Sequence, residues 1–140
     1  MEPDQKETPG ALCTDPDEYR YPEKIPYCKR DVSKSKKAQV IKVYENELGF
    51  EILDLGRENF KIDHLIPLCA GGSNDDSNLW PQYKEIYINT DPIEQVLCER
   101  MAEGMLLQKD AIVLVLDMKH YRKTPDEVMV ILNSLHKPKK

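Results

Sequence analysis

Apolar residues recur three and four positions apart in four stretches of the chain, the spacing that places them on one face of a helix. Helices are therefore predicted over residues 33–48, 90–103, 107–120 and 124–136. Side chains that can cap a helix stand at the start of three of these stretches: Ser33 or Ser35, Thr90 and Thr124. Glycine follows the first two stretches, which is a common way for a helix to end.

The middle of the chain has strand character instead. Residues 59–67 combine aromatic and β-branched residues, and residues 78–82 return to the core after a polar, glycine-containing loop at 71–77. Residues 50–55 alternate imperfectly between apolar and polar up to Gly56. Several helices with a few short strands predict an α+β fold.

The first 30 residues are polar and rich in proline, which predicts an extended arm lying on the domain. Within it, residues 1–10 are expected to be flexible, and residues 137–140 to form a loose tail. The remaining 11–136 are enough for a single domain with its own core. A composition of 40% hydrophobic and 32% charged residues is typical of a soluble globular protein. No apolar run is long enough to span a membrane.

The net charge of −5 is unevenly distributed along the chain. Residues 29–43 and 119–140 are basic, whereas 1–23 and 44–118 are acidic. A local basic surface can attract a polyanion whatever the net charge is. The alternative is that the basic residues are ordinary solvated helix faces. If nucleic acid binds, its predicted contacts are Lys34, Lys36, Lys37, Arg57 and Lys61.

Four cysteines occur without any CxxC pair, so a structural zinc site is not expected. We predict two disulfides, Cys13–Cys28 and Cys69–Cys98; the alternative is four unlinked thiols. The first bridge would tie down the proline-rich arm, and the second would join the strand at 59–67 to the helix beginning at Thr90. Disulfides indicate an oxidising compartment, so we expect a secreted or periplasmic protein whose signal peptide has been removed.

The candidate chemistry lies at Asp63, His64 and Asn78. A carboxylate is a hard oxygen ligand suited to Mg²⁺ or Mn²⁺, and a neutral histidine can take a proton from water. The Asn78 amide can bind a metal or fix a loop by bonding to the backbone. Such a set of groups suits the hydrolysis of phosphodiester bonds.

This region contains three short sequence motifs: IDHLIPL at Ile62–Leu68, GGSN at Gly71–Asn74 and NLWPQ at Asn78–Gln82. Together they resemble the HNH endonucleases, above all the small secreted bacterial members. The resemblance implies a ββα-metal (His-Me finger) core at about 58–90, with further packed helices and a disulfide-linked N-terminal arm around it. It also implies a Mg²⁺- or Mn²⁺-dependent nuclease that cuts DNA, or alternatively RNA, with little sequence preference.

The resemblance assigns roles to single residues. His64 matches the general base, Asp63 the preceding metal ligand, and Asn78 the asparagine that holds the catalytic loop or binds the metal. A further ligand is expected on the following helix, where Asn89 is the first candidate and Glu85 the second. Water or a substrate phosphate are the remaining options for that position.

Two other functions stay open. The first is a catalytically silent HNH-like domain that binds nucleic acid or protein, and the second is a disulfide-linked extracellular binding module. Tyr19, Tyr21 and Tyr27 are interpreted as packing the arm onto the domain, with nucleic-acid stacking as the alternative. Trp80 is interpreted as a core residue.

Overall fold

The computed structural model describes residues 1–136 and confirms the α+β class. The described part contains five α-helices and two antiparallel sheets of two strands each. In chain order the elements are β1 (Glu18–Arg20), β2 (Ile25–Tyr27), α1 (Lys34–Asn46), α2 (Ile52–Leu55), β3 (Phe60–His64), β4 (Leu79–Tyr83), α3 (Lys84–Ala102), α4 (Gln108–Lys119) and α5 (Pro125–Asn133). The expected tail at 137–140 lies outside the described residues.

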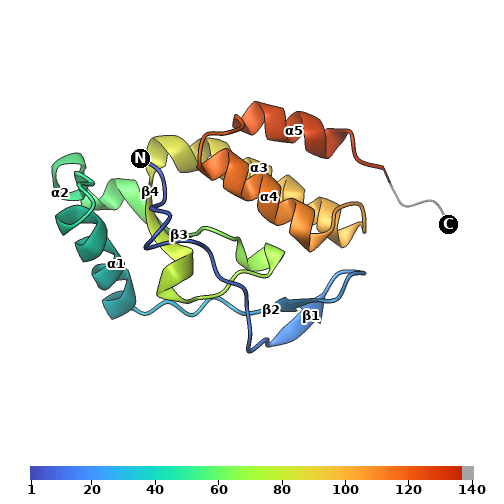
Figure 1. Cartoon of the computed structure of the whole chain (residues 1–140), viewed down its shortest axis with the longest axis horizontal. Helices are drawn as coiled ribbons and strands as arrows, with labels where there is room; N and C mark the ends of the chain where they lie inside the picture. Colours follow the sequence, from blue (N-terminus) through green and yellow to red (C-terminus); the bar gives the residue numbers. More distant parts are fainter. Residues whose placement is uncertain (137–140) are drawn as a thin grey trace.

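The buried hydrophobic residues form two clusters. One joins α3, α4 and α5, with Leu97, Val115 and Leu132 fully buried. The other joins α1 to the β3–β4 hairpin around Tyr44 and Trp80, which confirms Trp80 as a core residue. Figure 1 shows this division, with α1 and α2 at one end of the molecule and α3, α4 and α5 at the other.

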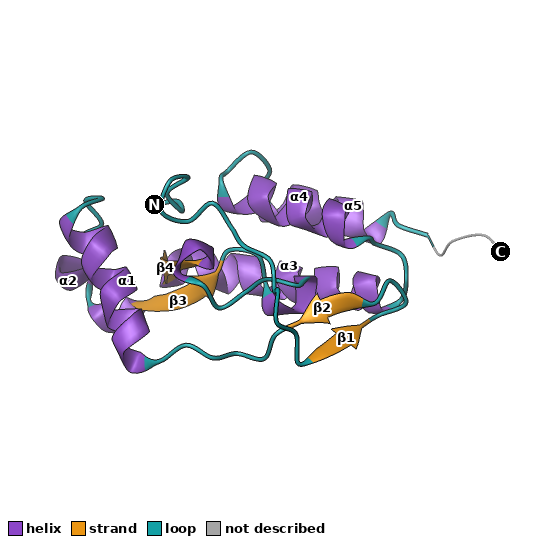
Figure 2. Cartoon of the chain, turned by 60° about the horizontal axis from the view of Figure 1, so that its bottom comes forward, coloured by secondary structure: helices purple, strands orange, loops and turns teal. Residues whose placement is uncertain are grey.

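The β3–β4 hairpin leads directly into α3, so two antiparallel strands and a helix follow one another in the region predicted at 58–90. The register pairs Asp63 with Trp80 and His64 with Leu79. The strands are joined by the long loop 65–78, and the β1–β2 hairpin lies in front of the helices next to it (Figure 2). His64 therefore ends a paired strand at the point where the loop begins.

The helices predicted at 33–48, 107–120 and 124–136 are confirmed as α1, α4 and α5, but the start predicted at Thr90 is wrong. Helix α3 begins at Lys84, and Thr90 is a buried residue inside it. Pro92 also lies inside α3, where it cannot donate to the carbonyl of Ile88. Because Ile88 is exposed, water can hydrogen-bond that carbonyl instead. Residues 52–55 form the short helix α2 rather than an alternating strand.

The N-terminal segment, where we expected residues 1–10 to be flexible, makes defined contacts with the rest of the domain. Thr8 is 1% exposed, and its hydroxyl hydrogen-bonds with the Tyr44 hydroxyl at 2.5 Å. The backbone N–H of Gly10 donates to the carbonyl of Ser77 at 2.9 Å. These contacts anchor the segment to α1 and to the 65–78 loop, an arrangement that a polar sequence does not reveal by itself.

Both predicted disulfides are confirmed. Cys13–Cys28 joins the arm to the end of β2, with a Cα–Cα distance of 5.8 Å. Cys69–Cys98 joins the 65–78 loop to α3, with a Cα–Cα distance of 5.9 Å. None of the helices described is long and apolar enough to cross a membrane.

Candidate functional site

The end of β3 opens into a pocket of about 300 Å³ that contains both Asp63 and His64. The pocket is built from the β1–β2 hairpin, the segment before α1, β3 with its loop, and α3. Its lining residues are Arg20, Tyr27, Arg30, Lys61, Asp63, His64, Pro67, Leu68, Cys69 and Glu94. Three cations, two carboxylates and one imidazole thus converge from segments far apart in the sequence.

The orientation of His64 is fixed by Asn74, whose Oδ1 lies 2.9 Å from the ring Nε2. Two backbone contacts determine which way the Asn74 amide faces. Its Nδ2 donates to the carbonyl of Lys29 at 2.8 Å, and its Oδ1 accepts from the N–H of Asp31 at 3.1 Å. Because Oδ1 can only accept, Nε2 of His64 must carry the proton. Nδ1 is then the acceptor nitrogen of the neutral ring.

The surroundings of His64 favour this neutral form. Burial lowers the pKa of His64, and the positive charges of Arg30 and Lys119 lower it further. The bond to Asn74 and the charge of Asp63 raise the pKa of His64 without offsetting these causes. At neutral pH the side chain is therefore an unprotonated base in a pocket wall, which is the state a general base needs.

Asp63 is held by two donors that both contact Oδ2. The Trp80 indole N–H donates at 2.8 Å and the Lys119 ammonium at 2.7 Å. The same ammonium pairs with Glu94 Oε1 at 2.5 Å and donates to the carbonyls of His64 and Leu65 at 3.0 Å each. Lys119 thus joins α4 to the backbone of the candidate catalytic residue and neutralises one of the two pocket carboxylates.

The charges of this network shift its protonation. Burial lowers the pKa of Lys119, but Asp63 and Glu94 outweigh burial and raise that pKa above its ordinary value. Burial raises the pKa of Glu94 to about 7; Lys119 opposes the shift and Asp63 adds to it. Burial, together with a single cation shared between two carboxylates, explains why the pKa of Glu94 is raised.

Asn78 fixes the loop and has no amide position left for a metal. Its Oδ1 accepts from the N–H of Ile66 at 2.9 Å and of Ala11 at 3.4 Å. Its Nδ2 donates to the carbonyls of Ile66 at 3.0 Å and Ser73 at 2.8 Å. The amide is fully buried. Of the two roles we considered, the structure supports the loop-fixing one.

The expected divalent-cation site is not assembled from the residues we predicted. Asn89 and Glu85 are exposed on α3, where the Asn89 amide donates to the Glu85 carbonyl at 3.2 Å, and neither lines the pocket. Asp91 on the same helix pairs with Lys61 of the pocket. Asn89 lies two residues before Asp91 and therefore roughly 200° around the helix axis from it. Residues 1–136 contain no group of three or more His, Cys, Asp or Glu placed to hold a metal ion. With Oδ2 of Asp63 engaged by Lys119, the predicted ligands do not converge on one cation position.

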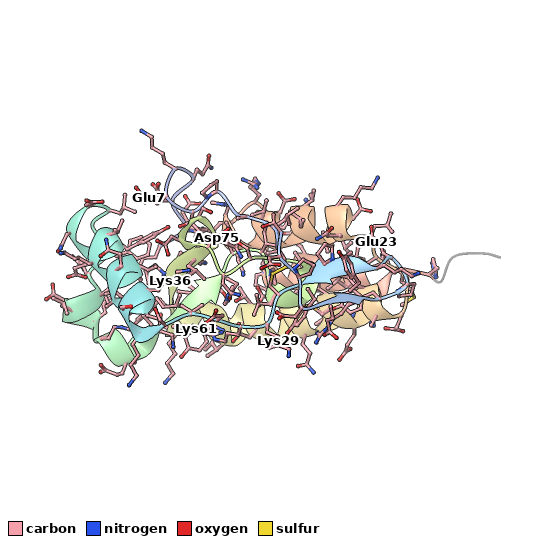
Figure 3. All side chains as sticks on the ribbon, turned by 90° about the horizontal axis from the view of Figure 1, so that it is seen from below. Glu7, Glu23, Lys29, Lys36, Lys61 and Asp75 are labelled. Carbon is pink, nitrogen blue, oxygen red and sulfur yellow. A yellow bond between two sulfur atoms is a disulfide. The ribbon has the colours of Figure 1, made fainter. Side chains whose placement is uncertain are left out.

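The predicted basic contacts lie at different distances from this chemistry. Lys61 is in the pocket, paired with Asp91 at 2.5 Å, and the Lys36 ammonium donates to the Asn74 carbonyl at 2.8 Å. Lys34 and Lys37 lie on α1, whereas Arg57 turns back to the carbonyl of Phe60. In Figure 3 the labelled lysines Lys29, Lys36 and Lys61 occupy one side of this face, and the labelled acids Glu7, Glu23 and Asp75 the other.

Sequence reasoning did not single out several of the residues that shape this pocket. They are Arg20, Arg30, Asn74, Glu94 and Lys119. Comparisons with protein-family models, with curated proteins and with solved structures find no match to this chain. The function has to be argued from the pocket itself.

Proposed function

We propose that this chain is a nuclease that hydrolyses phosphodiester bonds of nucleic acid, with His64 as the general base. The observation that carries the proposal is the His64 ring, fixed by Asn74 with Nδ1 unprotonated, in a pocket that also holds Arg30 and Lys61. Nδ1 would take a proton from water while the water oxygen attacks phosphorus and the bond to the leaving oxygen breaks.

The cations of the pocket would stabilise the charge that develops on phosphate. Arg30 lines the same pocket as His64, Lys61 lines it while paired with Asp91, and Lys36 contacts the Asn74 that orients His64. Fixed positive groups aimed at a phosphorane are worth more inside a partly buried pocket than in water. The acidic remainder of the chain does not prevent binding, because a phosphate responds to the local potential.

A second function is supported by the ion pairs of Asp63. Since Lys119 engages this carboxylate and the expected metal ligands do not converge, a nucleic-acid-binding domain without catalysis is the alternative. The two disulfides support an extracellular or periplasmic site of action for either function.

A plasmid-nicking assay separates the two functions. Supercoiled plasmid is incubated with the oxidised protein and Mg²⁺, Mn²⁺ or a chelator, and nicked and linear forms are quantified. Nicking in any of these conditions that disappears with His64→Ala supports the nuclease. Binding by gel shift with no nicking in all three supports the silent domain, and no binding at all contradicts both.

Asn74→Ala is predicted to slow cleavage roughly 10- to 100-fold, because it releases the imidazole from its productive orientation. The hydrogen bond to Asn74 raises the pKa of His64, so its loss should move that pKa further down. For a general base the rate rises with pH through the pKa and then levels off. The acid limb of the pH–rate profile should therefore move to lower pH while the plateau falls.

The control for this variant is Asn133→Ala at the end of α5, which should change neither the plateau nor the limb. A wild-type rate and an unchanged pH profile for Asn74→Ala would show that Asn74 does not position His64. Kinetics are measured on a defined oligonucleotide with substrate in excess of KM.

Neutralising Lys34 and Lys37 together is predicted to weaken nucleic-acid binding and reduce its salt dependence. Each lost phosphate contact should lower the slope of log K against log salt concentration by about 0.7 to 0.9. Lys34 and Lys37 both lie on α1, close in sequence to Lys36, and neither side chain makes a hydrogen bond or ion pair with the described residues. Equal neutralisation of Lys6 and Lys109, exposed outside the 29–43 segment, is the matched control. Identical slopes for the two double variants would show that the α1 surface is only solvated.

A further inference from the structure

We propose that the β1–β2 hairpin provides a stacking surface for a nucleobase beside His64, and that the site takes unpaired nucleotides in preference to duplex. This inference rests on the proposed nuclease function and names its substrate class. The juxtaposition that carries it is the stacked Arg20–Tyr27 pair in the pocket that holds the general base.

The Arg20 guanidinium lies over the Tyr27 ring, with its carbon 3.4 Å from the ring centroid. Its Nε–H also donates to Glu18 Oε1 at 2.7 Å, which holds the plane and offsets much of its charge. A guanidinium already paired with a carboxylate is a weaker phosphate ligand but still a planar surface. Bases stack on arginine planes and on tyrosine rings whatever their sequence.

The hairpin is fixed relative to the catalytic strand, so the surface exists before any substrate binds. Tyr21, next to Arg20, donates its hydroxyl to the carbonyl of Cys69 at 2.6 Å. The N–H of Gln108 donates to Glu23 Oε1 at 2.7 Å, and the Cys13–Cys28 disulfide ties the end of β2 to the arm. A rigid stacking surface loses little conformational entropy on binding.

The charge distribution around the pocket favours one strand over two. An open groove of about 560 Å³ continues from the pocket along α3 and shares four lining residues with it, Arg20, Lys61, Cys69 and Glu94. Its α3 wall carries the carboxylates of Asp91, Glu94 and Glu99, of which Asp91 is paired with Lys61 and Glu94 with Lys119. A duplex would bring a second phosphate backbone towards this wall and towards Glu99, which has no ion pair among the described residues, whereas a single strand can keep its phosphates on the basic side.

Pairing also hides the surface that Tyr27 and Arg20 would contact. Inside a duplex each base is covered on both faces by its neighbours, so only an unpaired or extruded base can enter a side pocket. The pocket of about 300 Å³ holds the stacked pair together with His64. A base seated on the pair would therefore belong to a nucleotide beside the phosphate that His64 serves.

The test measures binding and cleavage of three labelled oligonucleotides that share one strand: the single strand, its full duplex, and a duplex with one bulged nucleotide. Binding is followed by fluorescence anisotropy with the His64→Ala protein, and cleavage with the protein carrying His64. We expect the single strand to bind roughly tenfold or more tightly than the duplex, with the bulged duplex in between. Cleavage should follow the same order.

Tyr27→Leu should weaken single-strand binding roughly 5- to 100-fold and leave duplex binding nearly unchanged, as expected for one lost stacking contact. Tyr27→Phe keeps the ring and should keep the wild-type preference. Tyr19→Leu, on the same hairpin but 65% exposed and outside the pocket, is the matched control and should have no effect.

Equal affinity for single strand and duplex would overturn the inference and leave the nuclease standing, as would equal losses for Tyr27→Leu and Tyr19→Leu. Failure to bind or cleave any of the three oligonucleotides would overturn the proposed function and this inference with it. Circular dichroism of each variant separates lost stacking from lost structure, and a retained preference in Tyr27→Phe provides support that does not depend on Tyr27→Leu folding.

Discussion

His64→Ala is expected to reduce plasmid cleavage roughly 10²- to 10⁴-fold, the usual contribution of a general base. His64 is 6% exposed, yet it lines a pocket, so removal of its ring widens that pocket rather than leaving a closed cavity. The fold should therefore survive, which thermal unfolding by circular dichroism checks. His64→Asn, which keeps a polar side chain of similar length, provides a second variant.

Chemical rescue makes this prediction specific. Because the alanine leaves room beside Asn74, added imidazole should restore part of the lost rate, more so above the pKa of free imidazole. His120→Ala is the matched control, since the His120 ring pairs with Glu2 at 2.9 Å and lies outside the pocket. A folded His64→Ala protein that nicks plasmid at the wild-type rate would remove His64 from the reaction.

The sequence predicted local structure well where local chemistry decides it. Helix α5 begins where a capping box forms between Thr124 and Glu127, two residues that are close to each other in the sequence. The start of α3 could not be found in this way. Thr90, Asp91 and Pro92 have the composition of a helix start, but the strand–helix junction is set by pairing of Tyr83 with Phe60, more than twenty residues away.

The residues of the site could likewise be predicted where they lie close together in the sequence, but not where they come from distant segments. Asp63, His64 and Asn78 belong to one compact motif, and the structure places them at one hairpin and its loop. Arg20 and Arg30 reach the pocket from the arm, and no local pattern shows where an arm will lie. The sequence also could not show whether the Asp63 carboxylate is free to bind a metal, because its ion-pair partner, Lys119, comes from α4.

Lys119 did have a signal in the sequence. It follows Ala111 and Val115 at intervals of four, so it lies on the same helical face as two fully buried residues. A lysine on the apolar face of a helix must find buried acceptors or lose its charge. The sequence could not say which acceptors these are, and the structure supplies Asp63 and Glu94.

Lys119→Met is expected to destabilise the protein by about 3–5 kcal/mol, the range found when one partner of a buried ion pair is removed. Methionine fills the space of the lysine stem, but it leaves the carboxylates of Asp63 and Glu94 buried without their shared cation, and two backbone carbonyls lose a donor. Urea unfolding with an unchanged m-value measures the loss. Lys109→Met, exposed at the start of the same helix, should stay within about 0.5 kcal/mol of wild type.

The pH dependence of this loss identifies its cause. Burial already raises the pKa of Glu94 to about 7 in the presence of Lys119, and removing the ammonium should raise the pKa of this carboxyl further. A carboxyl whose pKa is higher in the folded state than in the unfolded state lowers stability as pH rises between the two values. The deficit of Lys119→Met should therefore be larger at pH 8 than at pH 5.

Adding Glu94→Gln to Lys119→Met should recover part of the stability at pH 8, because one uncompensated charge is gone. A deficit that is the same at both pH values, with no recovery in the double variant, would mean that Lys119 contributes by packing and not by binding the two carboxylates.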